Sequence, residues 1–200
     1  MGHQINNGMR PIYKFLNVEN FHAISYEVYK YVVNHTDILK SQKPVFFTDT
    51  DVQHALAHVP LLSDFLNQRS LIPTKFSIIV VPADMDPYLH VDTKDAFVRI
   101  LWPVSNCKGS RTKFYNIPRK YLKLSRLPDE GVIYYDIIKQ HNWEQVDEFE
   151  LSAPLIFDAS VAHAVHPAPN ATGHRISFSV GFDRELPISK SVNAWVGLNR

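Results

Sequence analysis

Hydrophobic residues before about residue 75 recur at helical spacing, three or four positions apart. The first such series predicts a helix from Asn20 to about Lys40, with Asn17 or Asn20 as its N-cap. A second series follows Thr50-Asp51 and reaches Phe65, although Pro60 should kink or interrupt that helix. We expect both helices to pack against the outside of a sheet.

From Lys75 onward, the pattern changes to short runs of alternating or β-branched residues separated by turn residues. Nine strands at this spacing are typical of a mainly β sandwich or jelly-roll barrel. The predicted strands are Phe76–Val81, Tyr88–Asp92, Phe97–Val104, Lys113–Ile117, Val132–Ile138, Trp143–Leu151, Leu155–Phe157, Ala162–Val165 and Arg175–Phe182.

The size and texture of the chain predict a single domain over residues 1–200, since 200 residues with 45% apolar content can fill one core. We expect a loose N-terminus over residues 1–10 and a helical part over 11–74. The jelly-roll core would follow over 75–183, and a C-terminal strap over 184–200 would cross its outside.

Charge and cysteine content narrow the classes of function. A net charge of +1 gives no signal for nucleic acid or for an acidic membrane surface. The single cysteine, Cys107, excludes an internal disulfide and fits a reducing compartment; we assign it no role. No signal peptide or membrane span of about 20 apolar residues is visible, so a cytoplasmic protein is expected.

One hairpin, from Leu155 to Phe182, combines an apolar framework with polar side chains. In its second strand Arg175, Ser177 and Ser179 share one face, and the alternate positions are apolar. A guanidinium can grip a carboxylate at two points. This strand therefore suggests the inside of a barrel that binds a small carboxylate.

A metal-ligand pattern lies on an earlier strand. His90 and Asp92 are two positions apart, so both side chains point to the same face. A third nitrogen ligand from the later hairpin would complete two histidines and one carboxylate. That set leaves about three coordination positions open, as non-haem Fe(II) oxygenases require.

With these residues together, the chain resembles the Fe(II)/2-oxoglutarate-dependent oxygenases of double-stranded β-helix (jelly-roll, cupin-like) fold. The prolyl-hydroxylase-like branch and small bacterial or phage relatives are the most similar in texture. The resemblance covers about Phe76 to Asp183 and depends on His90-Val-Asp92, the His-x-Val-x-Pro pattern and Arg175-Ile-Ser177. The family pattern favours His163 as the third ligand, with His166 as second choice, since a regular strand cannot turn both inward.

The resemblance implies that His90, Asp92 and the later histidine hold Fe(II). The co-substrate 2-oxoglutarate would chelate the metal and extend its far carboxylate to Arg175 and Ser177, with Tyr88 as a weaker candidate contact. Dioxygen would take the last position, and decarboxylation to succinate would be coupled to oxidation of a substrate. The presence of Asp92 favours hydroxylation. A peptide, an amino acid and a small metabolite all remain open as the substrate.

Two other functions remain open at this point. A non-catalytic jelly-roll module could bind a small anion or sugar, because fold alone does not fix function. An iron oxygenase could also bind a substrate carboxylate through the Arg-x-Ser pair without 2-oxoglutarate. The complete set of metal ligands and arginine favours the enzyme that uses 2-oxoglutarate.

Several further residues are weaker candidates. Arg99, Trp102, Thr112 and Tyr115 follow the His-x-Asp pair and could line a pocket or simply pack. The pair His54 and His58 shares a helical face, but no glutamate follows His54, so the zinc-protease signature is absent and a solvated helix face is expected.

Overall fold

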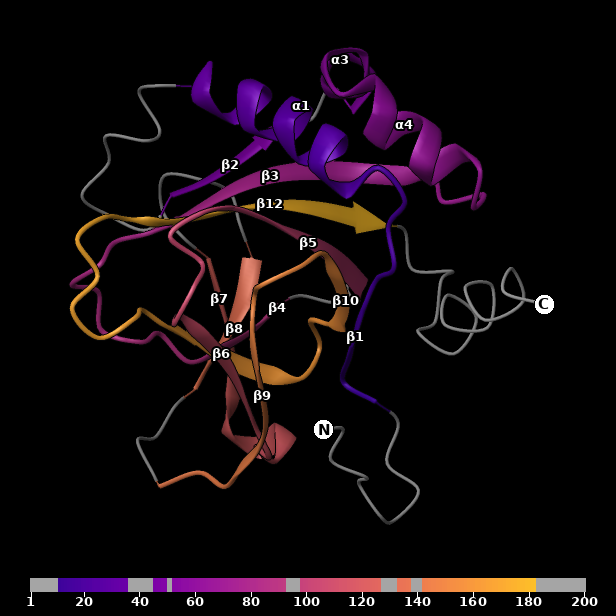
Figure 1. Cartoon of the computed structure of the whole chain (residues 1–200). Coiled ribbons are helices and arrows are strands. Elements are labelled where there is room, and N and C mark those ends of the chain that lie inside the picture. Colours follow the sequence, from indigo (N-terminus) through magenta and orange to yellow (C-terminus); the bar gives the residue numbers. More distant parts are fainter. Residues whose placement is uncertain are drawn as a thin grey trace.

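The computed structural model describes residues 11–35, 45–49, 52–92, 98–126, 133–137 and 142–182. These residues form antiparallel strands with a few helices on one side (Figure 1). The predicted loose N-terminus, the C-terminal strap and the Thr50-Asp51 cap lie outside the described residues.

Two six-stranded antiparallel sheets make up the β part, which confirms the prediction of a mainly β fold. The first has the order β1 (Tyr13–Phe15), β10 (Leu155–Asp158), β5 (Val98–Ser105), β12 (Arg175–Phe182), β3 (Pro73–Val81) and β2 (Val45–Asp49). The second has the order β7 (Leu122–Arg126), β8 (Ile133–Ile137), β4 (His90–Asp92), β11 (Ala162–His166), β6 (Arg111–Tyr115) and β9 (Gln145–Glu150). All nine predicted strands are present, and β1, β2 and β7 were not predicted. The predicted hairpin is wrong, because β11 lies in the second sheet between β4 and β6, whereas β12 lies in the first sheet between β5 and β3.

The helices lie in the first part of the chain, as predicted, but their bounds differ. They are α1 (Phe21–Val33), α3 (Val52–His58) and α4 (Pro60–Asn67), and η1 (Arg119–Tyr121) is a single 3₁₀ turn. The prediction that the first helix continues to about Lys40 is wrong, since α1 ends at Val33. At this end the His35 backbone N–H donates to the Val32 carbonyl at 3.0 Å, and the His35 ring nitrogen Nδ1 lies 2.9 Å from the Tyr31 carbonyl that a continuing helix would use. Pro60 starts α4, so the second predicted helix divides in two.

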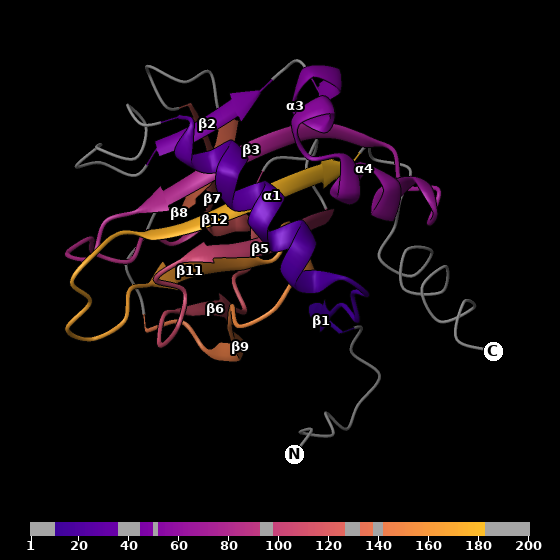
Figure 2. The ribbon, with the colours of Figure 1, turned by 45° about the horizontal axis from the view of Figure 1, so that its top comes forward.

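The helices cover one face of the first sheet (Figure 2). Side chains at alternate positions of β3, β5 and β12 pack with the helices in one core, which includes Val28, Leu62, Ile78, Trp102 and Phe178. The two-residue period of these strands turns their other side chains toward the second sheet. A second apolar core lies there, and Phe114, Phe149, Leu155 and Phe157 belong to it.

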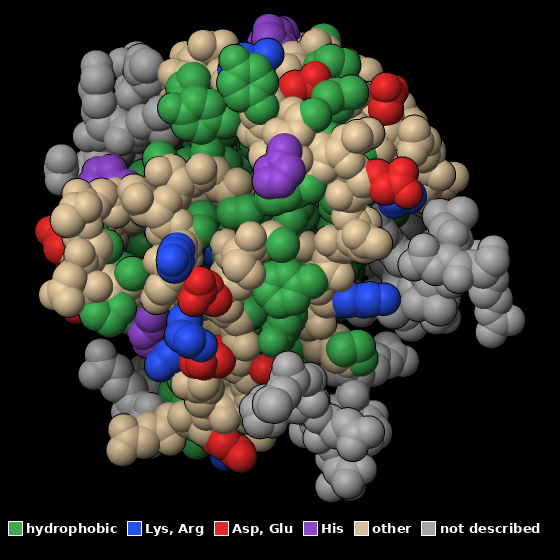
Figure 3. All heavy atoms as spheres, in the orientation of Figure 1, with side chains coloured by type: hydrophobic (Ala, Val, Ile, Leu, Met, Phe, Trp, Pro, Cys, Tyr) green, Lys and Arg blue, Asp and Glu red, His purple; other side chains and the backbone are tan. Residues whose placement is uncertain are grey.

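The outer surface carries charges of both signs. Basic and acidic side chains are interspersed on the face drawn in Figure 3. Among the helices that the structure describes, none is long and apolar enough to cross a membrane.

Candidate metal centre

Two neighbouring strands of the second sheet bring His90, Asp92 and His163 together. His90 on β4 is the register partner of His163 on β11, so their side chains leave the sheet on the same face. Asp92 follows two positions later and shares that face. One potential ligand atom from each of the three residues lies within 4.8 Å of the others, an arrangement that could hold a metal ion.

Main-chain carbonyl groups orient both imidazoles. Nδ1 of His90 lies 3.0 Å from the Tyr88 carbonyl oxygen, and Nδ1 of His163 lies 2.8 Å from that of Val161. A carbonyl can only accept, so each Nδ1 carries the proton and donates it. Each Nε2 therefore has a free lone pair, which is the form in which histidine binds metals.

The Asp92 carboxylate lies between the His90 imidazole and the Arg99 guanidinium. Its Oδ1 lies 3.7 Å from Nε2 of His90, and its Oδ2 lies 2.9 Å from Nε of Arg99 on β5 in the other sheet. Burial alone would raise the pKa of Asp92, but Arg99 and, to a smaller extent, the two imidazoles lower it below its ordinary value. The carboxylate is therefore ionised at neutral pH and can serve as a hard oxygen donor.

His163 is the most deeply buried member of the group, with 5% of its surface exposed. Its ring lies between apolar rings of the second core, 5.5 Å from Phe157 and 6.0 Å from Phe114 between centroids. This burial, reinforced by His90, lowers the pKa of His163 to about 4 against the opposite influence of Asp92. His163 is neutral and able to bind a metal across the physiological pH range.

The inner face of β12 carries a row of buried polar side chains. Arg175, Ser177 and Ser179 alternate with residues of the helix-side core and are 3%, 0% and 0% exposed. Ser179 accepts a hydrogen bond from Arg99 at 3.4 Å. Within the described part of the chain, Nε of Arg175 and the hydroxyl of Ser177 have no hydrogen-bond partner.

Arg175 also lacks a counter-ion among the residues that the structure describes, whose ion pairs do not include it. Burial lowers the pKa of its guanidinium, and the nearby Cys107 acts in the opposite direction. Cys107 itself is buried, and its thiol contacts the Ile176 carbonyl at 3.2 Å. A buried cation without an anion is costly, so this position suits an anionic ligand.

Thr112 adds a third polar group of this kind. It lies on β6 beside Val165 of β11 and is 3% exposed. Its hydroxyl has no hydrogen-bond partner among the described residues. The register gives Thr112 the same sheet face as Phe114 and His163, so the hydroxyl is directed to the space between the sheets.

The structure does not bring every predicted residue to this group. His166 lies on the opposite face of β11, where its Nε2 contacts the Tyr115 hydroxyl at 3.2 Å. Trp102 faces the helices and donates a hydrogen bond to Ser25. Tyr88 is 41% exposed, and its ring stacks on His90 at 5.4 Å.

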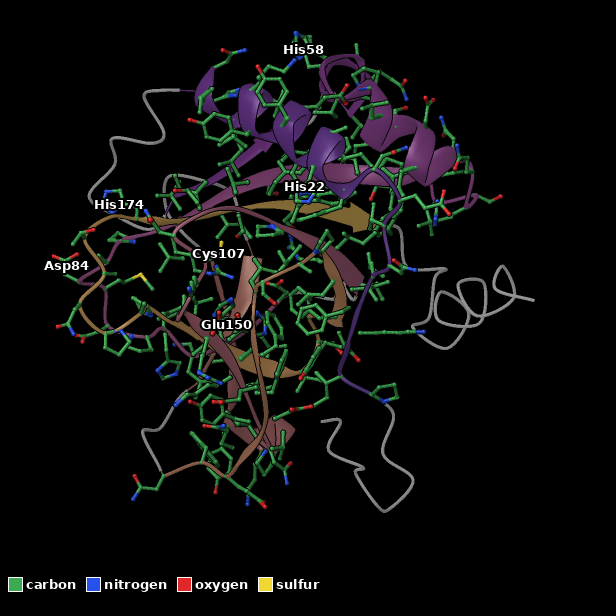
Figure 4. The ribbon with its side chains drawn as sticks, in the orientation of Figure 1. His22, His58, Asp84, Cys107, Glu150 and His174 are labelled. Atoms are coloured by element: carbon green, nitrogen blue, oxygen red, sulfur yellow. The ribbon has the colours of Figure 1, made fainter. Side chains whose placement is uncertain are left out.

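The paired histidines His54 and His58 lie on α3 in the helical layer. Nδ1 of His58 binds the His54 carbonyl at 2.9 Å, and the two rings are 4.5 Å apart. Figure 4 shows His58 on the outer side of the helices, away from the strands of the metal-ligand group. The pair is not part of the candidate centre.

Sequence reasoning named Arg99 only as a possible lining residue and missed its contact with Asp92. It gave no role to Lys75, which lies beside Gly181 on the same inner face. Burial and Arg99 lower the pKa of Lys75 against the influence of Asp92. The sequence did carry a signal, because Lys75 and Arg99 are cationic residues at inward positions of otherwise apolar strands. Asp92, the carboxylate that interacts with both, lies in the other sheet, so spacing along the chain could not relate it to them.

Comparisons with known proteins give similarity only among solved structures. No protein-family profile matches the chain, and no curated protein matches it. One similar solved structure is that of the epimerase SnoN in complex with Fe3+, alpha ketoglutarate and nogalamycin RO. It is 13% identical in sequence, the match covers 79% of this chain and 74% of that chain, and the TM-score is 0.46.

Two prolyl hydroxylases are also similar. A prolyl-4-hydroxylase from Pseudomonas putida is 14% identical, with 88% of this chain and 94% of that chain covered and a TM-score of 0.43. A prolyl hydroxylase from Trichoplax adhaerens, in complex with a hypoxia inducible factor peptide fragment, is 15% identical, with 90% of this chain and 86% of that chain covered and a TM-score of 0.46. Similarity at this level carries no conclusion about ligands or activity, which depend on the side chains described above.

Proposed function

We propose that this protein is an Fe(II)- and 2-oxoglutarate-dependent dioxygenase that hydroxylates a peptide, an amino acid or a small metabolite. One observation carries the proposal: three potential metal-ligand atoms converge on the second sheet, and the inward face of β12 in the first sheet holds a buried arginine that has no counter-ion among the described residues. The proposed framework is a single double-stranded β-helix domain with helices on its outside.

The proposed metal ligands are Nε2 of His90, a carboxylate oxygen of Asp92 and Nε2 of His163. Two neutral imidazoles and one carboxylate are the donor set of non-haem Fe(II) oxygenases, which keep about three positions open. When bound, Fe(II) with 2-oxoglutarate would supply oxidative power by decarboxylating the co-substrate with dioxygen. The protein's part is to fix the donors and to exclude water around His163.

For the co-substrate, the proposed anchor is Arg175. Its guanidinium would pair with the far carboxylate of 2-oxoglutarate, which removes the cost of a buried uncompensated cation. The Ser177 hydroxyl, two positions along the same face, would donate a hydrogen bond to that carboxylate. Thr112 supplies a second hydroxyl that has no hydrogen-bond partner in the described part of the chain, and it is a further proposed contact. Tyr88 stays a weaker candidate, because its ring is substantially exposed.

The first experiment is an anaerobic titration of Fe(II) into metal-free protein with 2-oxoglutarate. A keto acid chelated to such an iron gives a weak visible charge-transfer band. We expect the band in the wild type and in His166→Ala, because His166 faces away from the centre. We expect its loss in His163→Ala. In Arg175→Met the band should require a much higher 2-oxoglutarate concentration.

The variants separate the possible failures. If no Fe(II) binds to the wild type, the metal centre is wrong and a non-catalytic binding module becomes the better hypothesis. If Fe(II) binds but no band forms at high 2-oxoglutarate, an iron oxygenase that does not use this co-substrate replaces the proposal. Loss of Fe(II) binding in His166→Ala with retention in His163→Ala would exchange the third ligand.

A further inference from the structure

Arg99 makes a contact that the proposed chemistry has not used. Its Nε lies 2.9 Å from Oδ2 of Asp92, while Oδ1 of the same carboxylate is the oxygen next to His90. The two oxygens of Asp92 thus have different neighbours: one meets a guanidinium and the other faces the metal-ligand group.

The position of Arg99 is fixed by its own surroundings. Its side chain is 10% exposed, and NH1 donates to the Ser179 hydroxyl at 3.4 Å. Arg99 belongs to β5 in the first sheet, whereas Asp92 belongs to β4 in the second. The ion pair therefore spans the space between the sheets, and the backbone of two strands of different sheets determines its geometry.

We propose that Arg99 is a positioning residue that makes Asp92 a ligand through one oxygen only. This inference rests on the proposed metal centre. A free carboxylate can bind a metal through both oxygens. With Oδ2 occupied by the guanidinium, only Oδ1 is available, and the metal keeps its third open position. Without Arg99, the Asp92 carboxylate could rotate and bind the metal through both oxygens, and its second oxygen would fill the third open position.

The consequence for the chemistry follows from counting positions. A metal with six positions would keep three open if His90, Asp92 and His163 each gave one ligand atom. A chelating keto acid would need two of these positions, and one would remain for dioxygen. If Asp92 bound through two oxygens, the keto acid and dioxygen would compete for the last two positions. Arg99 therefore acts through Asp92 and need not touch the substrate.

The test uses Co(II) and Mn(II) as probes in the full chain, without substrate. Partners that support a metal ligand typically contribute about 10–100-fold to metal affinity. We expect Arg99→Met to weaken Co(II) binding by a factor in that range. We also expect a changed visible d–d spectrum and a lower water-proton relaxivity of the Mn(II) form, because fewer waters reach the metal. Added guanidinium should partly restore the wild-type spectrum in Arg99→Ala.

Three further variants guard the test. Arg175→Met removes the other buried arginine and should leave the Co(II) spectrum unchanged. Ser179→Ala removes only the support of Arg99 and should have the same kind of effect as Arg99→Met, but weaker. Arg99→Lys keeps the positive charge, and the same metal-binding measurements can be made on it if Arg99→Met does not fold.

Two results would overturn the inference, and they differ. If the wild type binds Co(II) and the Arg99 variants keep its affinity, spectrum and relaxivity, Arg99 does not position Asp92. If the wild type binds neither probe metal, the proposed metal centre itself fails and the inference fails with it.

Discussion

The tautomers of two histidines decide what the candidate centre can bind. His90 and His163 each hold the Nδ1 proton against a main-chain carbonyl only two residues earlier in the chain. This local contact leaves both Nε2 lone pairs on the inner face, beside an ionised carboxylate. The burial that keeps the His163 imidazole neutral also makes the metal-free protein sensitive to acid.

We predict that the metal-free protein loses stability as the pH falls from about 6.5 to 4. Its cause is His163, whose pKa is about 4 in the folded protein against 6.5 when exposed. In this window the unfolded chain binds a proton that the folded chain does not, so stability falls by up to about 3 kcal/mol. Chemical denaturation at several pH values, with a chelator present, measures the effect.

His163→Asn is the matched control for this measurement. The asparagine does not titrate, so the free energy of unfolding should change less between pH 6.5 and 4 than in the wild type. Equal slopes for the two proteins would show that His163 is not the group responsible.

A second prediction concerns the buried hydroxyl of Ser177. Because it has no described hydrogen-bond partner, its desolvation is not compensated. Ser177→Ala should raise the free energy of unfolding of the protein without ligands by about 1 kcal/mol. The same change should weaken 2-oxoglutarate binding to the metal-loaded protein several-fold. Thermal unfolding and a titration monitored by the charge-transfer band provide the two values.

Ser179→Ala serves as the control on the same strand. Its hydroxyl accepts a hydrogen bond from Arg99, so its removal should not stabilise the protein. If both serine variants were equally stable, the Ser177 hydroxyl would have a partner in solution.

At the scale of elements, one side-chain hydrogen bond ties the helical layer to the first sheet. Nε1 of Trp102, a fully buried residue on β5, donates to the Ser25 hydroxyl on α1 at 2.8 Å. The fully buried side chains of Val28 on α1 and Leu62 on α4 add apolar packing between the helices and the sheet. The helices thus cover the outer face of the strands whose inner face forms the site.

Ser25→Ala should lower the free energy of unfolding by about 1–3 kcal/mol, because the buried indole N–H loses its acceptor. Trp102→Phe removes the donor together with part of the packing. In the double variant, the Ser25 change should cost much less than in the wild type. A double-mutant cycle from denaturant unfolding measures this coupling. Additive costs would mean that the bond contributes nothing.

The sequence predicted those elements whose pattern is local. β12 and β3 alternate or form β-branched runs, and both appear where the periodicity predicted them. β1, β2 and β7 were missed although strands of the same length were predicted elsewhere. β1 and β2 pair with partners far along the chain, such as Phe157 for Tyr13 and Val80 for Val45, and this pairing leaves no local pattern. The end of α1 at Val33 was not predicted, because the spacing of hydrophobic residues does not reveal the contact between the His35 side chain and the Tyr31 carbonyl.

For the candidate site, sequence spacing could predict only which residues of one strand share a face. His90 and Asp92 are two apart and share a face by necessity, and the regular register of β11 turns His163 inward and His166 outward. The contact between Arg99 and Asp92 joins different sheets, so no spacing rule could predict it. The ligand assignment itself stays a prediction until metal binding is measured.

At the scale of the whole molecule, the candidate site lies between two sheets that each bring half of it. The second sheet carries the three candidate metal ligands, and the first carries Arg99, Arg175 and Ser177. The Arg99–Asp92 pair is a described ionic contact between the halves. A metal and an anion bound there would interact with both sheets, so binding should stabilise the fold as a whole.

The last prediction follows from this arrangement. Mn(II) at about 100 times its dissociation constant should add about 2.7 kcal/mol to the stability, equivalent to a rise in Tm of roughly 5–10 °C for a chain of this length. With Mn(II) present, 2-oxoglutarate should raise the Tm further, and without metal it should have a much smaller effect, because chelation and the Arg175 contact then do not act together. Anaerobic thermal unfolding with each ligand alone and with both measures the coupling.

Two variants assign the two contributions. Arg175→Met should keep the shift caused by Mn(II) and lose most of the increment from 2-oxoglutarate, because the far carboxylate no longer meets a buried cation. His163→Asn should lose both, since the co-substrate chelates through the metal. A full 2-oxoglutarate increment in Arg175→Met would move the anion anchor elsewhere on the inner face, and Lys75, the other inward cation of the first sheet, would be the next residue to change.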